Sequence, residues 1–113
     1  MVLKKRINFS NEDIYKKISI SDLILLSLYS LSFKKEKMSF EEIVAESFRL
    51  FPKIFSLKKF ENWPDSRKLD RPLRNLRSKK FIKGDPKTYF SLTNLGKKRA
   101  REISKKFYQK RLL

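Results

Sequence analysis

The sequence predicts a mainly α-helical fold that carries one small β-hairpin. Apolar residues recur at intervals of three and four, and Ser or Thr residues precede these runs where helices would begin. Two short runs rich in aromatic and β-branched residues flank the turn-forming residues 84–87 (GDPK), which predicts the hairpin. The chain has 113 residues, enough for one modest core, so we expect a single domain.

The N-terminal part predicts a basic arm and a buried helix. Residues 1–20 form the arm, in which Ser10 opens a capping-box pattern that predicts a short helix near 11–18. Ser21 is the expected N-cap of a helix over 22–33. Because the apolar residues of that helix occupy more than one face, we expect it at the centre of the core.

A second helix follows a polar turn. Ser39 and Glu42 stand as in a capping box, and Pro52 lies where a helix tends to stop. Glu42 and Glu46 share a face, but no further carboxylate is grouped with them in the sequence, so we expect a solvated face rather than a metal site. The apolar stripe of this helix comprises Phe40, Ile43, Val44, Phe48 and Phe51.

Residues 52–65 are too aromatic for a linker and too irregular for a clear helix. A connection of this length in a small domain is usually ordered or functional, so we expect it to fold back and enlarge the core. Trp63 could stack on a nucleic-acid base, but core packing is the favoured interpretation. The large apolar side chains expected in the core are Phe55, Leu57, Phe60 and Trp63.

The segment 66–80 predicts an amphipathic helix with an apolar side and a basic side. Leu69, Leu73 and Leu76 cluster on one side of a helical wheel. Arginine suits bidentate hydrogen bonds to guanine and phosphate, and asparagine suits adenine, so the basic side has the chemistry of a DNA recognition helix. That basic side comprises Arg67, Arg71, Arg74 and Ser78, with Asn75 at its edge.

Pro72 leaves the start of this helix open. If the helix begins near Ser66, Pro72 lies in its interior, removes a hydrogen bond and kinks it. If Pro72 is the first helical residue, Asp70 or Arg71 is the cap and Arg67 falls in the preceding turn. Both alternatives leave Arg74 and Ser78 facing outward.

A hairpin over 81–92 and a final helix complete the chain. Lys83 and Lys87 lie at the ends of the hairpin, where they could contact a phosphate backbone. Thr93 is the expected N-cap of the final helix, which begins at about 93. The apolar stripe of that helix comprises Ala100, Ile103 and Phe107.

The charge of the chain favours a polyanionic partner. The formal net charge is +17, and it is uneven: residues 52–113 carry 20 basic and 5 acidic residues, whereas residues 1–51 carry 9 and 7. Nucleic acid is the first candidate and an anionic membrane surface the second. The alternative is that the protein comes from a lysine-rich proteome and that its basic residues are solvated surface without a binding role. The concentration of positive charge in residues 52–113 argues against this alternative.

The residue types that are missing exclude many chemistries. The chain has no Cys and no His, and therefore lacks thiolate nucleophiles, imidazole bases and the usual zinc ligands. We expect no catalysis, no metal and no cofactor. The lack of cysteine, and hence of disulfides, is consistent with the reducing interior of a cell. The longest uncharged stretch, 23–33, is far shorter than the ~20 residues that span a bilayer. We expect a cytoplasmic, nucleoid-associated protein with no signal peptide and no membrane segment.

The stretches LRNLRSKKFIKG and YFSLTNLGKKRA, at 73–84 and 89–100, resemble the winged helix-turn-helix domains of MarR-like and PadR-like regulators. In those domains a leucine-bearing recognition helix is followed by a wing and by an L-T-x-x-G step, which here is Leu92, Thr93 and Gly96. The segment 50–66 is similar to stretches of uncharacterised prokaryotic winged-helix proteins. The resemblance implies a three-helix core plus a wing and a C-terminal helix, within a domain over 21–113.

By this resemblance, the helix over 66–80 would enter the major groove of double-stranded DNA and the wing over 81–92 would lie on the backbone. The long connection at 52–65 and Pro72 depart from the family pattern, which affects the expected groove geometry more than the fold. The implied DNA contacts are Arg67, Lys68, Arg71, Arg74, Asn75, Ser78 and Lys79 on the helix, and Lys83, Gly84 and Lys87 on the wing.

The leading hypothesis is a sequence-preferring DNA-binding protein that regulates transcription, with a homodimer through the C-terminal helix as the expected assembly and a monomer as the alternative. An RNA-binding or ribonucleoprotein component, or a DNA-binding subunit of a larger assembly, is the second hypothesis. A metal-dependent nuclease is the third. Pro64 and Asp65 match the start of one nuclease motif, but no acid-x-Lys follows at a suitable place, so we disfavour it.

Overall fold

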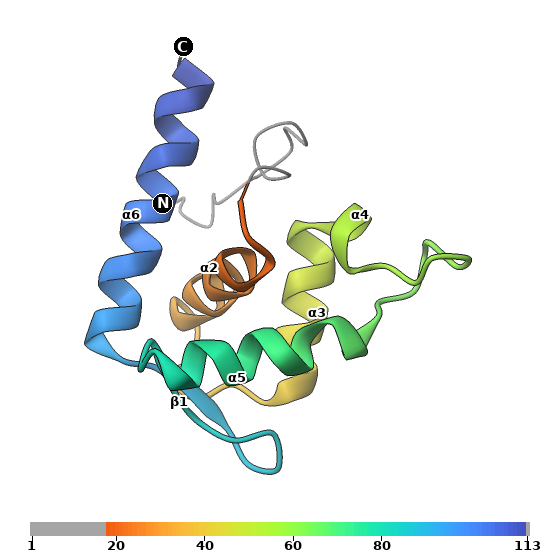
Figure 1. Ribbon diagram of the computed structural model, residues 1–113, viewed down its shortest axis with the longest axis horizontal. Coiled ribbons are helices and arrows are strands. Elements are labelled where there is room, and N and C mark those ends of the chain that lie inside the picture. Colours follow the sequence, from red (N-terminus) through yellow and green to blue (C-terminus); the bar gives the residue numbers. More distant parts are fainter. Residues whose placement is uncertain (1–17, 113) are drawn as a thin grey trace.

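The computed structural model describes the backbone of residues 18–112 and the side chains of residues 18–106. This part is mainly helical with one small antiparallel hairpin, as predicted (Figure 1). Nearly all of the helix predicted near 11–18 lies outside the described residues. The elements are α2 (Ile20–Ser32), α3 (Phe40–Leu50), α4 (Pro52–Phe55), the 3₁₀ turn η1 (Ser66–Leu69), α5 (Asp70–Ser78), β1 (Ile82–Gly84), β2 (Phe90–Leu92) and α6 (Asn94–Leu112).

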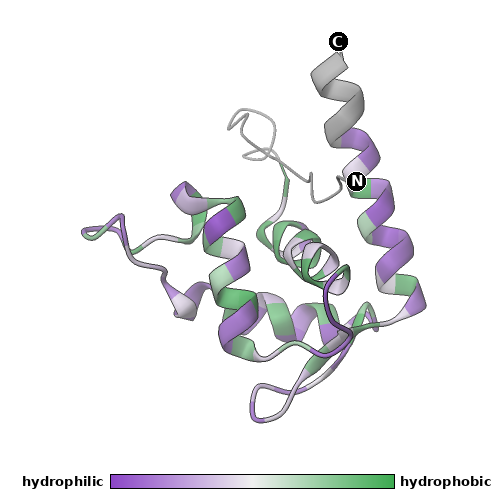
Figure 2. Cartoon of the chain, turned by 180° about the vertical axis from the view of Figure 1, so that it is seen from behind, coloured by the Kyte–Doolittle hydropathy of each residue, from purple (hydrophilic) through white to green (hydrophobic). Residues whose placement is uncertain are grey.

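Helix α2 lies at the centre of the core, as its apolar composition predicts. It contacts α3, α5 and α6, and Figure 2 shows its mostly hydrophobic residues between those helices. The helix begins earlier than predicted, because the N-cap is Ser19 and not Ser21: the Asp22 amide donates to the Ser19 hydroxyl at 3.2 Å. Its fully buried side chains include Leu23, Ile24, Leu25, Leu26 and Leu28.

Helix α3 begins with the predicted capping box. The Glu42 amide donates to the Ser39 hydroxyl at 3.1 Å, and the Ser39 amide donates to the Glu42 carboxylate at 2.8 Å. The helix ends at Leu50, and Phe51 is fully buried. Pro52 then opens the short helix α4 as its first residue, a position where the missing amide proton costs nothing.

The prediction of a solvated face on α3 is wrong for Glu46. Its side chain is buried between α2 and α3, where the Ser30 hydroxyl donates to it at 2.6 Å and the Arg49 guanidinium donates at 3.0 and 2.7 Å. Burial raises the pKa of Glu46, but the hydrogen bonds from Arg49 and Ser30 outweigh burial and hold the pKa below its ordinary value of 4.5. Glu46 is therefore a structural carboxylate that joins two helices.

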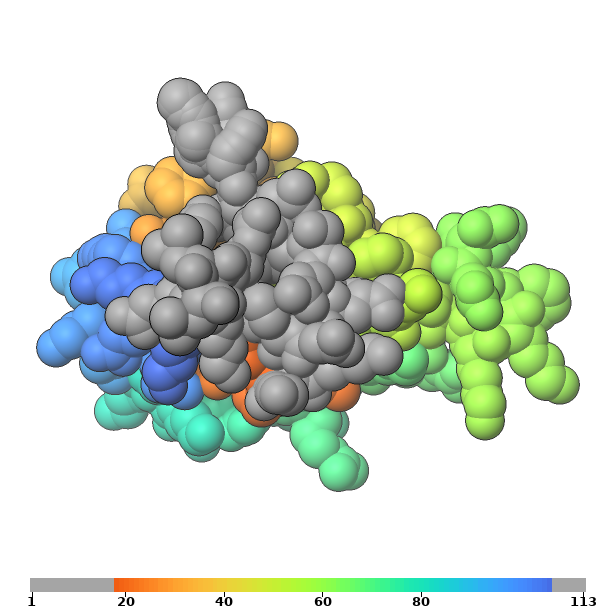
Figure 3. Space-filling view, turned by 90° about the horizontal axis from the view of Figure 1, so that it is seen from above, coloured from red at the N-terminus to blue at the C-terminus, as the bar shows by residue number. Residues whose placement is uncertain are grey.

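The connection over 52–65 is ordered, and only part of it enlarges the core. Phe55 is buried, as predicted. The prediction is wrong for Phe60 and Trp63, whose side chains are 63% and 64% exposed. The reason lies in the backbone, because the Leu57 amide donates to the Trp63 carbonyl at 2.8 Å and turns the segment back on itself. Figure 3 shows this segment, coloured light green, projecting from the body of the molecule.

The 3₁₀ turn η1 leads directly into α5 and resolves the position of Pro72. The α-helix begins at Asp70, so Pro72 is its third residue. Amides in the first turn of a helix have no intrahelical partner, and a proline there removes no hydrogen bond. Arg67 lies in the preceding turn, as the second predicted alternative requires, but the rest of that alternative is wrong. Pro72 is not the first helical residue, and the residue at the N-cap position is Leu69 rather than Asp70 or Arg71.

Helix α5 ends in a Schellman motif that reverses the chain toward the hairpin. The Phe81 amide donates to the Leu76 carbonyl at 3.0 Å, and the Lys80 amide donates to the Arg77 carbonyl at 2.9 Å. Lys80 takes the left-handed conformation that this motif needs, with φ of 65°. Strand β1 begins two residues later.

The hairpin pairs Ile82 with Leu92 and Gly84 with Phe90. Phe90 also forms a two-way bridge with Met38, in which each amide donates to the other carbonyl at 2.8 Å. Since Met38 lies in the turn between α2 and α3, the bridge fixes the hairpin to the helical core.

Helix α6 is braced at its start by Thr93, the predicted N-cap. The Thr93 hydroxyl accepts from the Gly96 amide at 3.0 Å and lies within hydrogen-bond distance of the Lys80 and Phe81 carbonyls. Further along, the Arg99 guanidinium pairs with the Asp22 carboxylate of α2 at 3.0 Å. Ala100 and Ile103 are buried, as predicted, whereas the side chains of Phe107 and later residues lie outside the described part.

Candidate nucleic-acid interface

Helix α5 presents a basic side to solvent because its two leucines and Leu69, at the end of η1, fill the core. Leu69, Leu73 and Leu76 are all at most 3% exposed. This fixes the rotation of the helix and turns Arg71 and Arg74 outward, together with the hydroxyl of Ser78. Of the carboxylates in residues 18–106, none forms an ion pair with Arg71 or Arg74. Both guanidinium groups therefore retain their hydrogen-bonding capacity for a partner.

Arg67 is exposed but already has a partner within the chain. Its Nε donates to the Asp65 carboxylate at 3.3 Å, and its amide donates to the same oxygen at 3.1 Å. Asp65 caps η1 through this amide contact. The Arg67 side chain is 83% exposed, so its ion pair with Asp65 is weak and most of the side chain faces solvent.

Lys68, a predicted DNA contact, is exposed and lies in η1, ahead of α5. Its ammonium group donates to the Ile54 carbonyl at 2.9 Å and to the Ser56 carbonyl at 3.2 Å. These bonds tie η1 to the end of α4.

Asn75 lies at the edge of the basic side and faces α2. Its side-chain amide donates to the Ser21 hydroxyl at 3.3 Å, a long bond at an exposed position. Lys79 is exposed at the C-cap of α5. Both residues border the surface formed by Arg71 and Arg74.

Two exposed cations near the end of α5 were not among the predicted contacts. Arg77 lies at the other edge of the helix, and Lys80 occupies the left-handed position after it. A helical wheel would have found Arg77. Lys80 could not be placed from the sequence, because its orientation depends on the Schellman motif.

The hairpin places Lys83 and Lys87 in solvent, as predicted. Gly84 has a structural role and not only a place on the surface: its φ is 112°, and a Cβ there would lie 1.9 Å from the Tyr89 carbonyl oxygen. The Asp85 carboxylate accepts from the Lys87 amide at 2.8 Å and shapes the turn.

Helix α6 adds a further set of exposed cations. They lie away from the buried Ala100 and Ile103, and they were not predicted as contacts. A wheel of the final helix would have shown them. They are Lys97, Lys98, Arg101, Lys105 and Lys106.

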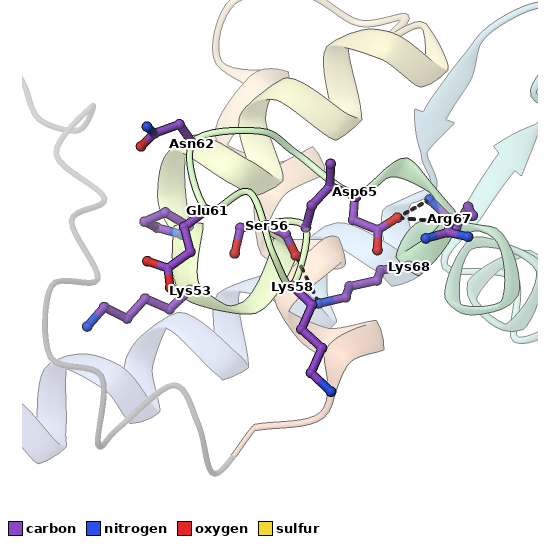
Figure 4. A pocket seen from close by; sticks show the side chains of 10 residues that line it. Lys53, Ser56, Lys58, Glu61, Asn62, Asp65, Arg67 and Lys68 are labelled. Atoms are coloured by element: carbon purple, nitrogen blue, oxygen red, sulfur yellow. Dashed lines mark hydrogen bonds and ion pairs between the residues drawn. The ribbon is translucent and has the colours of Figure 1, made fainter.

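An open hollow of about 770 Å³ lies beside η1 (Figure 4). Its lining comes from α4, the projecting connection and η1, and it contains both acidic and basic side chains. Within the described residues there is no group of three or more carboxylates that could hold a metal ion. None of the described helices is long and apolar enough to cross a membrane.

Comparison with known proteins finds no matching family model, no similar curated protein and no similar solved structure.

Proposed function

We propose that this protein is a winged helix-turn-helix protein that binds double-stranded DNA and regulates transcription, with α5 in the major groove. One observation carries the proposal: buried leucines at the end of η1 and in α5 anchor the helix, while Arg71 and Arg74 stand exposed, unpaired with any carboxylate in residues 18–106. A helix of this width fits the major groove, where arginine forms bidentate bonds with guanine.

The hairpin is the proposed wing, and it contributes phosphate contacts. Lys83 and Lys87 are exposed on it, and the bridge between Met38 and Phe90 holds the hairpin firmly against the core. Phosphate contacts position a protein on DNA, whereas base contacts specify the sequence. The proposed division of labour is therefore base contacts from α5 and backbone contacts from the wing. We propose a binding rather than a catalytic role, in a cytoplasmic, nucleoid-associated protein.

The first test is affinity as a function of salt and of nucleic-acid type. Fluorescence anisotropy would measure binding to a pool of random duplexes, to single strands and to structured RNA at several salt concentrations. We expect duplex DNA to bind best, with log affinity falling by roughly 0.9 per neutralised phosphate against log salt. Tighter binding of structured RNA would overturn the DNA proposal and favour a ribonucleoprotein component.

The second test locates sequence preference. A selection from random duplexes should yield a preferred site with the wild type, and the Arg71→Ala/Arg74→Ala double variant should lose that preference. The loss of a bidentate contact to a base costs ~1–3 kcal/mol in discrimination. The matched control is Lys105→Ala/Lys106→Ala, which removes the same charge from the part of α6 far from α5 (Figure 1). A control variant that loses the preference equally would overturn the assignment to α5.

We also propose a homodimer through α6. The C-terminal part of α6 extends beyond the rest of the molecule (Figure 1), and a two-fold pair would place two copies of α5 on successive half-sites. Sedimentation equilibrium with and without the selected duplex is the measurement. A monomer that binds one copy per selected site would overturn this part of the proposal.

A further inference from the structure

Residues 56–64 form a projecting loop, here named the aromatic loop, that is ordered yet exposes two large rings. Its ends are joined by a backbone bridge between Ser56 and Pro64, and its tip by a bond from the Trp63 amide to the Phe60 carbonyl at 3.0 Å. The base of the loop is held by Phe55, which is buried and accepts from the Asp65 amide at 2.7 Å. The backbone is therefore fixed while Phe60 and Trp63 remain in solvent.

Two exposed aromatic side chains on a fixed loop indicate a binding surface. Phe60 and Trp63 are 63% and 64% exposed, although burial of rings of this size is strongly favourable. A single exposed apolar residue needs no explanation, whereas exposed apolar surface that gathers in one place indicates a contact site. The two residues before Phe60 are Lys58 and Lys59, both exposed. With Glu61 the loop carries two cations and one carboxylate, so its formal net charge is positive, which complements a polyanion.

The aromatic loop is continuous with the proposed DNA surface. The hollow beside η1 is lined both by loop residues, including Lys58 and Asn62, and by Arg67 of η1 (Figure 4). Because η1 runs directly into α5, the hollow connects the loop with the N-terminal end of that helix. A nucleic acid that extends past this end of α5 would reach the loop.

The polar lining of the hollow offers both donors and acceptors, as the edges of bases do. The Asp65 carboxylate at its inner side is buried and already accepts from the Arg67 amide and guanidinium. Glu61 and Asn62 add an acidic and an amide side chain. The lining also includes cations, among them Lys58 and Arg67. Base edges offer both donors and acceptors and can therefore pair with such a mixed lining.

We propose that the aromatic loop binds unpaired nucleotides next to the duplex that α5 contacts. Bases stack on Phe60 and Trp63, and the phosphates between them lie near Lys58 and Lys59. Stacking on aromatic side chains needs bases that have left the double helix, since the faces of paired bases are already covered. This inference rests on the proposed function, because the adjoining duplex is the one that α5 would hold. Charge complementarity favours nucleic acid over an apolar protein partner.

Trp63 reports on this proposal directly, because it is the only tryptophan in the chain. The full chain is titrated with a blunt duplex and with the same duplex carrying a single-stranded extension, while intrinsic fluorescence and anisotropy are recorded. Stacking of a base on Trp63 should quench its emission with the extended duplex and leave it nearly unchanged with the blunt one. The extended duplex should bind at least about fivefold more tightly per stacked base.

The Phe60→Ala/Trp63→Ala variant tests the role of the rings. We expect the advantage of the extended duplex to fall to about onefold, while affinity for the blunt duplex changes less than twofold. Trp63→Phe keeps a ring and should retain most of the advantage. The matched control is Phe33→Ala, which removes another exposed ring, 60% exposed, from the end of α2. Circular dichroism verifies that each variant is folded.

The outcomes separate this inference from the proposed function. If the blunt duplex binds with a preferred sequence and the extension changes neither affinity nor fluorescence, the inference is overturned and a protein partner becomes the better explanation of the exposed rings. If single strands bind through the loop and no duplex binds, the proposed function is overturned. The inference is then overturned too, because it requires a bound duplex beside the loop. Quenching and an affinity gain that both depend on the rings support the inference.

Discussion

The α-carbon of Gly96 faces the main-chain carbonyl of Phe81 so closely that a β-carbon there would lie 1.9 Å from the carbonyl oxygen. Phe81 follows the end of α5, and Gly96 lies in the first turn of α6. Thr93 reinforces the contact, because its amide donates to the same Phe81 carbonyl at 3.1 Å. The two helices that frame the hairpin are thus fixed to each other through the backbone.

Gly96→Ala should destabilise the protein by about 2–4 kcal/mol, because the added methyl group meets a backbone atom that cannot move aside cheaply. Chemical denaturation followed by circular dichroism measures the change. Lys98→Ala in the same helix is the control, since Lys98 is exposed and should change the free energy of unfolding by less than about 0.5 kcal/mol. Equal stabilities for both variants would show that α6 does not pack on Phe81 in this way.

Lys80→Gly should stabilise the fold. Lys80 has φ of 65°, in the left-handed region. This conformation costs a residue with a β-carbon about 1 kcal/mol of conformational free energy, whereas glycine adopts it without that cost. The greater freedom of glycine in the unfolded chain offsets part of the gain, so we expect a net increase of about 0.5 kcal/mol in the free energy of unfolding. Lys79→Gly is the matched control, because Lys79 has φ of −83° and the same change should destabilise. A stabilised control would contradict this account.

Acid should weaken the protein through Glu46. The folded-state pKa of this carboxyl lies below its ordinary value of 4.5, so its contribution is present above about pH 4.5 and is lost as the pH falls through the folded pKa. Glu46→Gln should cost about 1–2 kcal/mol at pH 7, because it removes a charged acceptor from the Arg49 and Ser30 hydrogen bonds. The measurement is urea denaturation between pH 7 and pH 3.

The variant should also show a shallower loss of stability below pH 4.5 than the wild type. Glu41→Gln provides the comparison, because Glu41 lies exposed on the same helix without an ion pair to a cation in residues 18–106. Its pH profile should match the wild type. A Glu46→Gln profile as steep as that of the wild type would assign the acid sensitivity to other carboxyls.

Local signals predicted the helical elements well. The capping box at Ser39 and Glu42, the leucine side of α5 and the cap at Thr93 all depend on residues a few positions apart, and the structure confirms each of them. Ser21 was the wrong cap because Ser19 competes for the same role two residues earlier, and sequence alone gives no basis for choosing between two serines.

Long-range partners decided what local signals could not. The burial of Glu46 depends on Ser30 from another helix. The position of Lys68 depends on carbonyls twelve and fourteen residues away. Each of these contacts joins parts of the chain whose proximity is set by the packed fold, so a periodic pattern carries no information about them.

Removal of the two wing lysines should weaken DNA binding equally for all duplex sequences. Lys83 and Lys87 are exposed on the hairpin, and we expect each to neutralise one phosphate. The Lys83→Ala/Lys87→Ala variant should therefore reduce the slope of log affinity against log salt by about 1.8 while keeping the preferred site of the wild type. Lys68→Ala is the control, because it also removes lysine charge, but from an ammonium group that is bonded to main-chain carbonyls. The salt slope of Lys68→Ala should stay close to that of the wild type. A change in the preferred sequence of the wing variant would place base contacts on the hairpin and contradict the proposed division between wing and helix.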